Sequence, residues 1–350
     1  MAKEKLIVLY GGRSAEREVS VMSATNVVKS VDYARFSVQT VFIASDGDFY
    51  RGELFDAVPD APLLDNASAL ANRKISPALL TELGDVVFPV LHGPQGEDGS
   101  IQGFLEILKM PYAGPGILSA AATMDKLVSK EIFAQIGIPQ VPYVGITDGV
   151  ISDEKIAEIN EKLTYPVFVK PANMGSSVGI SKVNTAQELL SALTEAAKFD
   201  SRIVVEEGLI NPREVETGAL GNGDAVEIAG PGEVANSGNF YDYDEKYKND
   251  ALTIDVPAHL PEDVAAAIRA YAAQAYKAVA GTGLSRCDFF IERATGAIYL
   301  NEINAIPGFT AFSMYPLLWE NRGLTVREQI TRFVELGKAR FAERERHLAN

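Results

Sequence analysis

The chain has 350 residues, of which 47% are hydrophobic and 23% are charged, and its formal net charge is −15. This length predicts two or three domains, and so negative a chain without a long basic run is not expected to bind nucleic acid or an anionic membrane surface. The single cysteine excludes an internal disulfide, and the N-terminal apolar run is too short for a signal peptide, so we expect a cytoplasmic protein.

The first part of the chain predicts alternating strands and helices. KLIVLYGG is a continuous apolar run that ends in glycines, as in a buried parallel strand, and Ser14 is expected to cap the helix that follows. FSVQTVFIA predicts a second strand, residues 45–80 predict mainly loops, and DVVFPVL predicts a strand that ends in the loop HGPQGEDGS. We therefore expect an α/β domain over residues 1–121, with an open parallel sheet that binds a ligand at the carboxyl ends of its strands.

The rest of the chain predicts two α+β domains, over residues 122–212 and 213–350. The first begins with the helix MDKLVSKEIFAQIG and contains the strands YPVFVK and SRIVVEE, with a glycine-serine loop after YPVFVK. The second contains the strand REVETGALGN, the helix PEDVAAAIRAYAAQAYKAVAG and the strands LSRCDFFIER and AIYLNEIN. The final segment, REQITRFVELGKARFAERERHLAN, predicts an amphipathic surface helix of mixed charge that is largely solvated.

The loop in VKPANMGSSVG suits a polyphosphate. Its small residues let backbone amides approach phosphates closely, and its hydroxyls add donors. It is not a Walker loop, which would open a helix, and an ordinary glycine-rich hairpin is the alternative. Lys170 before the loop and Lys126 from another element favour a nucleotide site, although each lysine alone would be interpreted as a solvated surface charge.

Two strands near the C-terminus carry oxygen ligands. Alternation along LSRCDFFIE places Arg286 and Asp288 on one face of a sheet, and Glu302 and Asn304 share a face in AIYLNEIN. If these strands pair as a hairpin, Asp288, Glu302 and Asn304 converge as the all-oxygen set that Mg²⁺ takes together with nucleotide phosphates. A solvated acidic sheet edge is the alternative.

Further residues have both a structural and a functional interpretation. Glu16 and Glu18 lie in the predicted first turn of a helix, where the helix dipole alone would favour them. His92 follows a strand, where a ligand-binding histidine and an ordinary loop histidine are equally expected. Cys287 alternates with its charged neighbours, so we expect a buried thiol on the opposite face and not a nucleophile.

Several motifs together resemble the D-alanine:D-alanine ligase family of the ATP-grasp superfamily. They are GGRSAEREVS, HGPQGEDGSIQG, MDKLVSK, VKPANMGSSVG, FYDYDEKY, SRCDFF and NEINAIPGFT, and they span essentially the whole chain in the family's order. The resemblance implies a three-domain ATP-grasp fold, with ATP between the second and third domains. It also implies a cytoplasmic homodimer that uses ATP and two Mg²⁺ or Mn²⁺ ions to join two D-alanine molecules, through a D-alanyl phosphate, into D-alanyl-D-alanine for peptidoglycan synthesis.

The resemblance further implies a role for each residue that matches a family motif. The first D-alanine is held by Glu16, Ser176, Tyr247 and His92, and the carboxylate of the second by Ser313. Arg286 and the Gly308 amide stabilise the tetrahedral oxyanion. The implied nucleotide contacts are Lys126, Lys170, Ser177, Glu206, Glu207, Leu209, Glu214 and Lys246. The implied metal ligands are Asp288, Glu302 and Asn304.

One departure from the family pattern and two alternative functions accompany this resemblance. The segment VVEEGLINPRE, which carries the adenine contacts, differs from many family members. Ligases that take D-lactate as the second substrate carry histidine or phenylalanine in the loop where this chain has Tyr247. An ATP-grasp protein that only senses nucleotide is a further alternative, but it would not need the complete set of lysines, metal ligands and oxyanion-stabilising groups.

Overall fold

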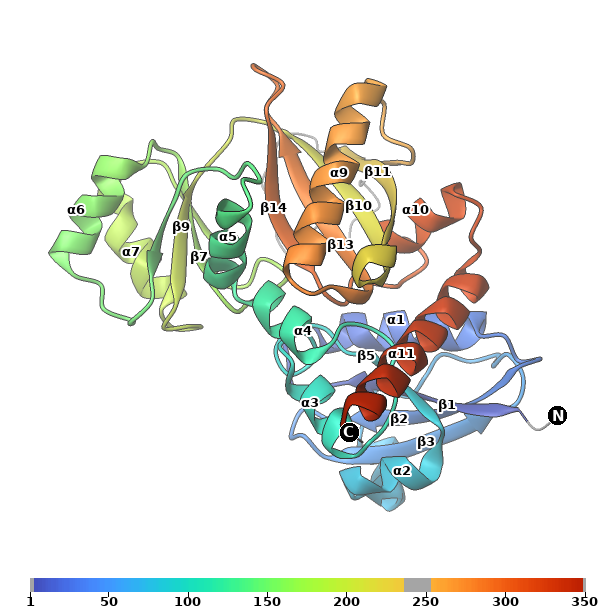
Figure 1. Ribbon diagram of the computed structural model, residues 1–350. Helices are drawn as coiled ribbons and strands as arrows, with labels where there is room; N and C mark the ends of the chain where they lie inside the picture. Colours follow the sequence, from blue (N-terminus) through green and yellow to red (C-terminus); the bar gives the residue numbers. More distant parts are fainter. Residues whose placement is uncertain (1–2, 236–252, 349–350) are drawn as a thin grey trace.

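The computed structural model describes residues 3–235 and 253–348. Three β-sheets follow one another along the chain, and Figure 1 shows them as an N-terminal sheet in blue, a middle sheet in green and a third sheet in yellow to orange. Lys246 and Tyr247, two of the residues given a role above, lie outside the described residues. No helix within the described ranges is both long enough and apolar enough to cross a membrane.

The N-terminal sheet has five strands in the order β4-β3-β2-β1-β5. β1 (Glu4–Gly11) pairs in parallel with β2 (Phe36–Ile43) and β5 (Val86–Val90), which confirms the predicted parallel centre. β3 (Phe49–Phe55) and β4 (Lys74–Ile75) extend the sheet in antiparallel orientation.

The prediction of mainly loops over residues 45–80 missed these two strands, and the predicted parallel pairing holds at the centre of the sheet and not at this edge. The sequence of β3 is FYRGELF, and most of its side chains are partly or fully exposed. An edge strand of this kind lacks the continuous apolar run that identifies a central parallel strand. Within the described residues, short 3₁₀ helices also occur at Ser68–Arg73, Pro77–Leu79 and Gly223–Ala225.

Alternate side chains of each strand in the N-terminal sheet point to opposite faces. Helices cover both faces. One face packs against α1 (Arg17–Ser30) and α11 (Val326–Leu348), which comes from the far end of the chain. The other face packs against α2 (Leu80–Leu83) and α3 (Ser100–Ile107).

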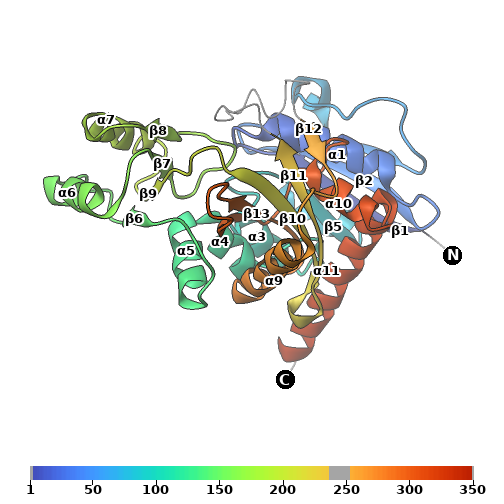
Figure 2. The same ribbon diagram turned by 90° about the horizontal axis from the view of Figure 1, so that it is seen from above.

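The middle sheet has four antiparallel strands in the order β6-β9-β7-β8. Its strands are β6 (Tyr143–Ile146), β7 (Val167–Pro171), β8 (Ser181–Val183) and β9 (Ile203–Glu207). The helices before and beside it are α4 (Ile117–Met124), α5 (Lys126–Gln135), α6 (Asp153–Lys162) and α7 (Ala186–Ala196). Figure 2 shows these strands, with α6 and α7, standing to one side of the third sheet.

The third sheet has five antiparallel strands in the order β12-β11-β10-β13-β14. Its strands are β10 (Arg213–Asn222), β11 (Glu227–Ala235), β12 (Thr253–Asp255), β13 (Thr282–Ile291) and β14 (Ile298–Asn304). One face packs against α9 (Glu262–Ala278), and α10 (Met314–Asn321) packs on the other. Cys287 is fully buried in the core under α9, as predicted, and burial raises the pKa of its thiol.

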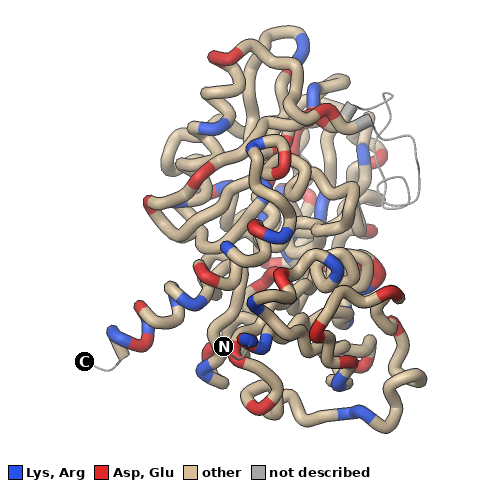
Figure 3. The backbone as a smooth tube through the Cα atoms, turned by 90° about the vertical axis from the view of Figure 1, so that its right-hand side faces the viewer, with Lys and Arg blue, Asp and Glu red and all other residues tan. Residues whose placement is uncertain are grey.

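Helix α11 is not the solvated surface element that its mixed charge predicted. Ile330, Phe333 and Val334 are fully buried, and Figure 1 shows α11 running beside α1 and across β5. The ring of Phe333 packs on Phe88 of β5 and on Phe309, with centroid distances of 5.9 and 5.7 Å. The charged residues of α11 occupy its remaining faces, so the helix fastens the N-terminal sheet to the third sheet. Figure 3 shows acidic and basic segments interspersed along the rest of the chain.

Candidate active site

Glu16 lies where the N-terminal sheet meets the glycine-serine loop. Its side chain is 8% exposed, and the Ser176 hydroxyl donates a hydrogen bond to its carboxylate. A Cβ atom at Gly93 or Gly175 would lie 2.5 or 2.7 Å from Glu16 Oε2, so only glycine permits this approach from either side. Two of the three predicted members of the Glu16, Ser176 and Tyr247 group are thus in contact.

The start of α1 differs from the prediction. Glu16, and not Ser14, is the residue before the first helical position, and no side chain caps the helix. The Ser14 hydroxyl instead donates to the His92 carbonyl at 2.7 Å and accepts from the Glu16 amide at 3.2 Å. Ser14 therefore links the loops that follow β1 and β5.

The glycine-serine loop connects β7 and β8 and has an unusual backbone. Ser176 and Ser177 have φ values of 48° and 61°, in the left-handed region that non-glycine residues seldom adopt. Such strain is found at functional sites when the surrounding structure holds it in place. The contact between Ser176 and Glu16 is one such restraint.

His92 is buried, and the groups around it define its protonation. Its Nδ1 lies 3.0 Å from the Ile306 carbonyl oxygen, which can only accept, so Nδ1 carries the proton. Its Nε2 lies 3.1 Å from the Ser23 hydroxyl. Burial lowers the pKa of His92 to about 4, opposed by the bond to Ile306 and assisted by the positive charge of Arg286. Both ring nitrogens of a neutral imidazole are therefore engaged by protein groups.

β13 and β14 form the predicted antiparallel hairpin, with Asp288 opposite Glu302 and Arg286 opposite Asn304. Arg286 donates two hydrogen bonds to the Asp288 carboxylate, at 2.7 and 2.8 Å, and the Asn304 amide donates a third at 2.9 Å. No group of three or more His, Cys, Asp and Glu residues in the described ranges is arranged to hold a metal ion. The set consists of two carboxylates and one amide, and its oxygen donors fit a hard cation.

A ladder of charged side chains continues across the third sheet from this hairpin. Glu216 of β10 lies opposite Asp288, and its carboxylate is 2.9 Å from Arg286 Nε. Glu214 lies two residues earlier on the same strand and therefore on the same face. Arg286 thus sits between two carboxylates, which fixes its guanidinium group beside Asn304.

Lys126, at the first position of α5, brings the loop and the hairpin together. Its Nζ donates to the Met174 carbonyl at 2.7 Å and lies 3.6 Å from Glu302 Oε2. Asp125 accepts hydrogen bonds from the amides of Leu127 and Val128 and so caps the helix that carries this lysine.

Lys170 pairs with Glu206, a residue predicted to contact adenine. The Glu206 carboxylate also lies 2.9 Å from Lys130 Nζ, and the side chains of Glu206 and Lys130 are 3% and 2% exposed. Burial alone would raise the pKa of Glu206, but the two lysines lower it to about 2. The carboxylate of Glu206 is thus committed to holding two lysines.

The remaining predicted residues lie on the edges of the same region. The Glu207 carboxylate accepts from the Thr164 amide at 2.7 Å, and Leu209 follows two residues later, partly exposed. Ser313 accepts from the Thr310 amide at 2.9 Å and precedes α10. No described residue accepts a hydrogen bond from the Gly308 amide, so this donor is unused by the described part of the chain.

Some residues of this region were missed from the sequence. Lys130 lies four residues after Lys126 and so shares a face of α5 with it, a helical spacing that could have identified it. Glu97 lies in the HGPQGEDG motif, but its partners are distant in sequence. It accepts from the Gly93 and Ile306 amides, each at 3.0 Å. Burial, and then the charge of Glu16, raise the pKa of Glu97 to about 8.

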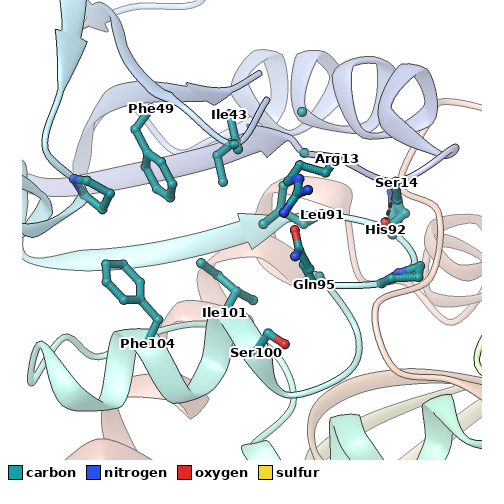
Figure 4. Close-up of a pocket in the computed structure, with 16 residues that line it drawn as sticks. Arg13, Ser14, Ile43, Phe49, Leu91, His92, Gln95, Ser100, Ile101 and Phe104 are labelled. Carbon is teal, nitrogen blue, oxygen red and sulfur yellow. Dashed lines mark hydrogen bonds between the residues drawn. The ribbon is translucent and has the colours of Figure 1, made fainter. Parts of the chain in front are cut away.

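A cavity of about 320 Å³ lies beside this region in the N-terminal unit. Figure 4 shows its apolar walls, formed by Ile43, Phe49, Ile101 and Phe104, with Arg13 and Gln95 nearer to Ser14 and His92. Of the residues predicted from the sequence, the cavity shares only His92 with the candidate site. Glu16, Ser176, Lys126 and Glu302 instead lie where the three sheets meet.

Comparisons with known proteins cover the whole chain. Residues 5–115 match the family model for the D-ala D-ala ligase N-terminus, and residues 132–335 match that for the D-ala D-ala ligase C-terminus. D-alanine–D-alanine ligases of Lactococcus lactis subsp. lactis and Streptococcus pneumoniae are 55% and 53% identical, over 99% of this chain and 100% and 99% of their own lengths.

Solved structures with the same arrangement include two ligases. The D-alanine-D-alanine ligase from Coxiella burnetii has a TM-score of 0.82 and 31% identity, covering 100% of this chain and 98% of that one. The VanG D-Ala:D-Ser ligase from Enterococcus faecalis has a TM-score of 0.80 and 33% identity, covering 96% of this chain and 100% of that one.

Proposed function

Because the chain belongs to the D-alanine–D-alanine ligase family, with its ATP-grasp fold, we propose that it joins two molecules of D-alanine at the expense of ATP. A carboxylate is a poor electrophile, so the terminal phosphoryl group of ATP is first transferred to a carboxylate oxygen of one D-alanine, and ADP is released. The amino nitrogen of the second D-alanine then attacks the acyl carbon and loses a proton, and the bond to phosphate breaks. The products are D-alanyl-D-alanine, a precursor for peptidoglycan, and phosphate.

One observation carries the proposal: Lys126 touches both the glycine-serine loop, at Met174, and the carboxylate edge, at Glu302. A nucleotide whose phosphates lie between these two elements would meet Lys126, Lys170 and the backbone of the loop at Ser177. Positioned cations and amides are what phosphoryl transfer requires. Lys246, from the part of the chain outside the described residues, is proposed to add a further phosphate contact.

The burial of Glu206 changes the set of residues that we propose to contact adenine. Since its carboxylate holds Lys130 and Lys170, we assign this residue the task of orienting Lys170, and leave adenine to Leu209 and the backbone around Glu207. Glu214, on the open face of β10, is proposed to contact the nucleotide sugar or phosphates.

Asp288, Glu302 and Asn304 are the residues that would hold Mg²⁺ or Mn²⁺, two ions in the proposed site. Such ions, when bound, offset the charge of the phosphates. Arg286 donates hydrogen bonds to Asp288 and Lys126 pairs with Glu302, so neighbouring cations hold both carboxylates in position.

The substrates are proposed to lie between Glu16 and the 305–309 loop, which follows β14. Glu16, with Ser176 and Tyr247, would bind the ammonium group of the first D-alanine, and Ser313 the carboxylate of the second. Arg286 and the unused Gly308 amide would stabilise the oxyanion, since preorganised donors aimed at developing charge are the largest catalytic effect in such reactions.

The second substrate is the point on which a rival function differs. The structural relatives include a D-Ala:D-Ser ligase, and D-lactate is the acceptor expected of ligases with histidine or phenylalanine in the loop that carries Tyr247. We expect a mixture of ATP, Mg²⁺, D-alanine, D-serine and D-lactate to yield D-alanyl-D-alanine as the main product by mass spectrometry. ATP consumption without a dipeptide product would contradict the proposed function.

The wider organisation is also proposed from the family. We propose three domains, over residues 1–121, 122–212 and 213–350, in a cytoplasmic homodimer. Ile107 of α3 and Leu118 of α4 are apolar side chains that are 83% and 67% exposed, and we propose that they contribute to the dimer contact.

A further inference from the structure

Four side chains of the N-terminal unit hold the 305–309 loop by its backbone, two on each side of Gly308. We call them the loop frame: Ser23 and Asn26 from α1, and His92 and Glu97 from the loop between β5 and α3. They donate to or accept from the backbone of only two residues, Ile306 and Phe309.

The loop frame forms hydrogen bonds with both the backbone amide and the backbone carbonyl of Ile306 and of Phe309. Before the glycine, the Ile306 amide donates to Glu97 at 3.0 Å, and the Ile306 carbonyl accepts from His92 at 3.0 Å. After it, the Phe309 amide donates to the Ser23 hydroxyl at 3.1 Å, and the Phe309 carbonyl accepts from Asn26 at 2.8 Å. Pro307 has no amide hydrogen, so the Gly308 amide is the donor that these four bonds leave unused.

Glu97, His92 and Ser23 are in turn fixed within their own unit. The second oxygen of Glu97 accepts from the Gly93 amide at 3.0 Å, and the Ser23 hydroxyl also lies 3.1 Å from His92 Nε2. Gly93 is one of the two glycines that pack against Glu16, so the proposed ammonium-binding carboxylate and the frame share a rigid support.

We propose that the loop frame positions the Gly308 amide for the oxyanion, with Glu97 and Asn26 as positioning residues that touch no substrate. This proposal rests on the proposed function of the site. A displacement of about 1 Å at a preorganised donor can cost about 100-fold in rate. Freeing one side of the loop should therefore slow the step in which the tetrahedral carbon forms, without affecting nucleotide binding.

Glu97→Gln is the direct test, because it keeps the size of the side chain and replaces one acceptor oxygen by an NH₂ group that cannot accept from a backbone amide. Asp98→Asn is the matched control. Its two oxygens also accept backbone amides, from Gln95 at 2.8 Å and Ser100 at 2.9 Å, but both bonds stay within its own loop. Asn26→Leu removes the donor on the other side of the glycine and does not alter Glu97.

We expect Glu97→Gln and Asn26→Leu to lower kcat by about 10- to 100-fold. The KM for ATP should change by less than about twofold, since the lysines lie on other elements. Asp98→Asn should keep the wild-type kcat. Positional isotope exchange in ATP, which reports reversible formation of the acyl phosphate, should decline less than dipeptide synthesis in both frame variants. Circular dichroism and thermal melting establish which variants are folded at the assay temperature.

Three outcomes would overturn the proposal. They are wild-type kcat in either folded frame variant, an equal loss in Asp98→Asn, or a parallel loss of isotope exchange and dipeptide synthesis. If Glu97→Gln does not fold, Asn26→Leu decides alone. Failure of the proposed function is a different result, because then the wild-type protein itself makes no dipeptide.

Discussion

Glu206 illustrates how a single buried carboxylate can organise a site. It lies between Lys130 and Lys170 at 3% exposure, so removing its charge would leave two ammonium groups together in a desolvated position. We expect Glu206→Gln to lower the free energy of unfolding by about 3–5 kcal/mol, measured by urea denaturation.

A close control exists on α6. Glu158 also lies between two lysines, Lys155 and Lys162, at 2.6 and 2.8 Å, but at a solvated position. Glu158→Gln should have little effect, because water and side-chain entropy cancel most of an exposed ion pair. Equal losses in the two variants would show that burial is not what makes Glu206 important.

His92 gives a pH dependence whose sign follows from its lowered pKa. Between its ordinary value of 6.5 and about 4, the unfolded chain binds a proton that the folded protein does not, so stability falls as the pH falls. The slope is about 1.4 kcal/mol per pH unit within this window. His92→Asn keeps a donor toward Ile306 and removes the titration.

The comparison is made by urea unfolding at several values between about pH 7.5 and pH 5. The stability difference between wild type and His92→Asn should shrink as the pH decreases. Both proteins retain Glu97, whose raised pKa acts in the opposite direction throughout this range. A difference that stays constant with pH would mean that His92 is not held neutral.

The proposed metal ligands lie at one end of the β13–β14 hairpin. Asp288→Asn keeps the shape of the side chain but removes its charge, and we expect kcat to fall by about 100-fold or more with the fold intact. Glu292→Gln at the turn of the same hairpin, where Glu292 accepts from Thr295 at 2.5 Å, should leave turnover unchanged. Turnover would be measured in steady-state assays over a range of Mg²⁺ concentrations. Wild-type turnover in Asp288→Asn would contradict the assignment of Asp288 as a metal ligand.

The hairpin also shows what the sequence could and could not predict. The alternation of Arg286, Cys287 and Asp288 was enough to predict which side chains share a face, because strand geometry is local. The hydrogen bonds of the loop frame could not be predicted, since Glu97 and Ile306 are 209 residues apart. The burial of α11 likewise depends on contacts with a sheet formed by the first part of the chain. The charged residues on the other faces of α11 led to the prediction of a solvated helix.

For the whole molecule, Phe333 of α11 is the point where the units join. Its ring contacts Phe88 of the N-terminal sheet, Phe309 of the 305–309 loop and Tyr315 of α10. We expect Phe333→Ala to lower the free energy of unfolding by about 3–5 kcal/mol, through lost burial and the cavity that remains. Glu343→Ala, at an exposed position of the same helix, is the control in the same urea experiment, and similar losses in both would contradict this role.

The position of α11 has a consequence for how the chain matures on the ribosome. The larger core cluster of the middle sheet is made of residues between Val144 and Val205, so it can close as soon as this stretch has been translated. The core on one face of the N-terminal sheet includes Ile330, Phe333 and Val334, which emerge after almost everything else. We therefore expect this face of the N-terminal sheet to be completed only after α11 has been synthesised, and to remain an exposed apolar surface until then.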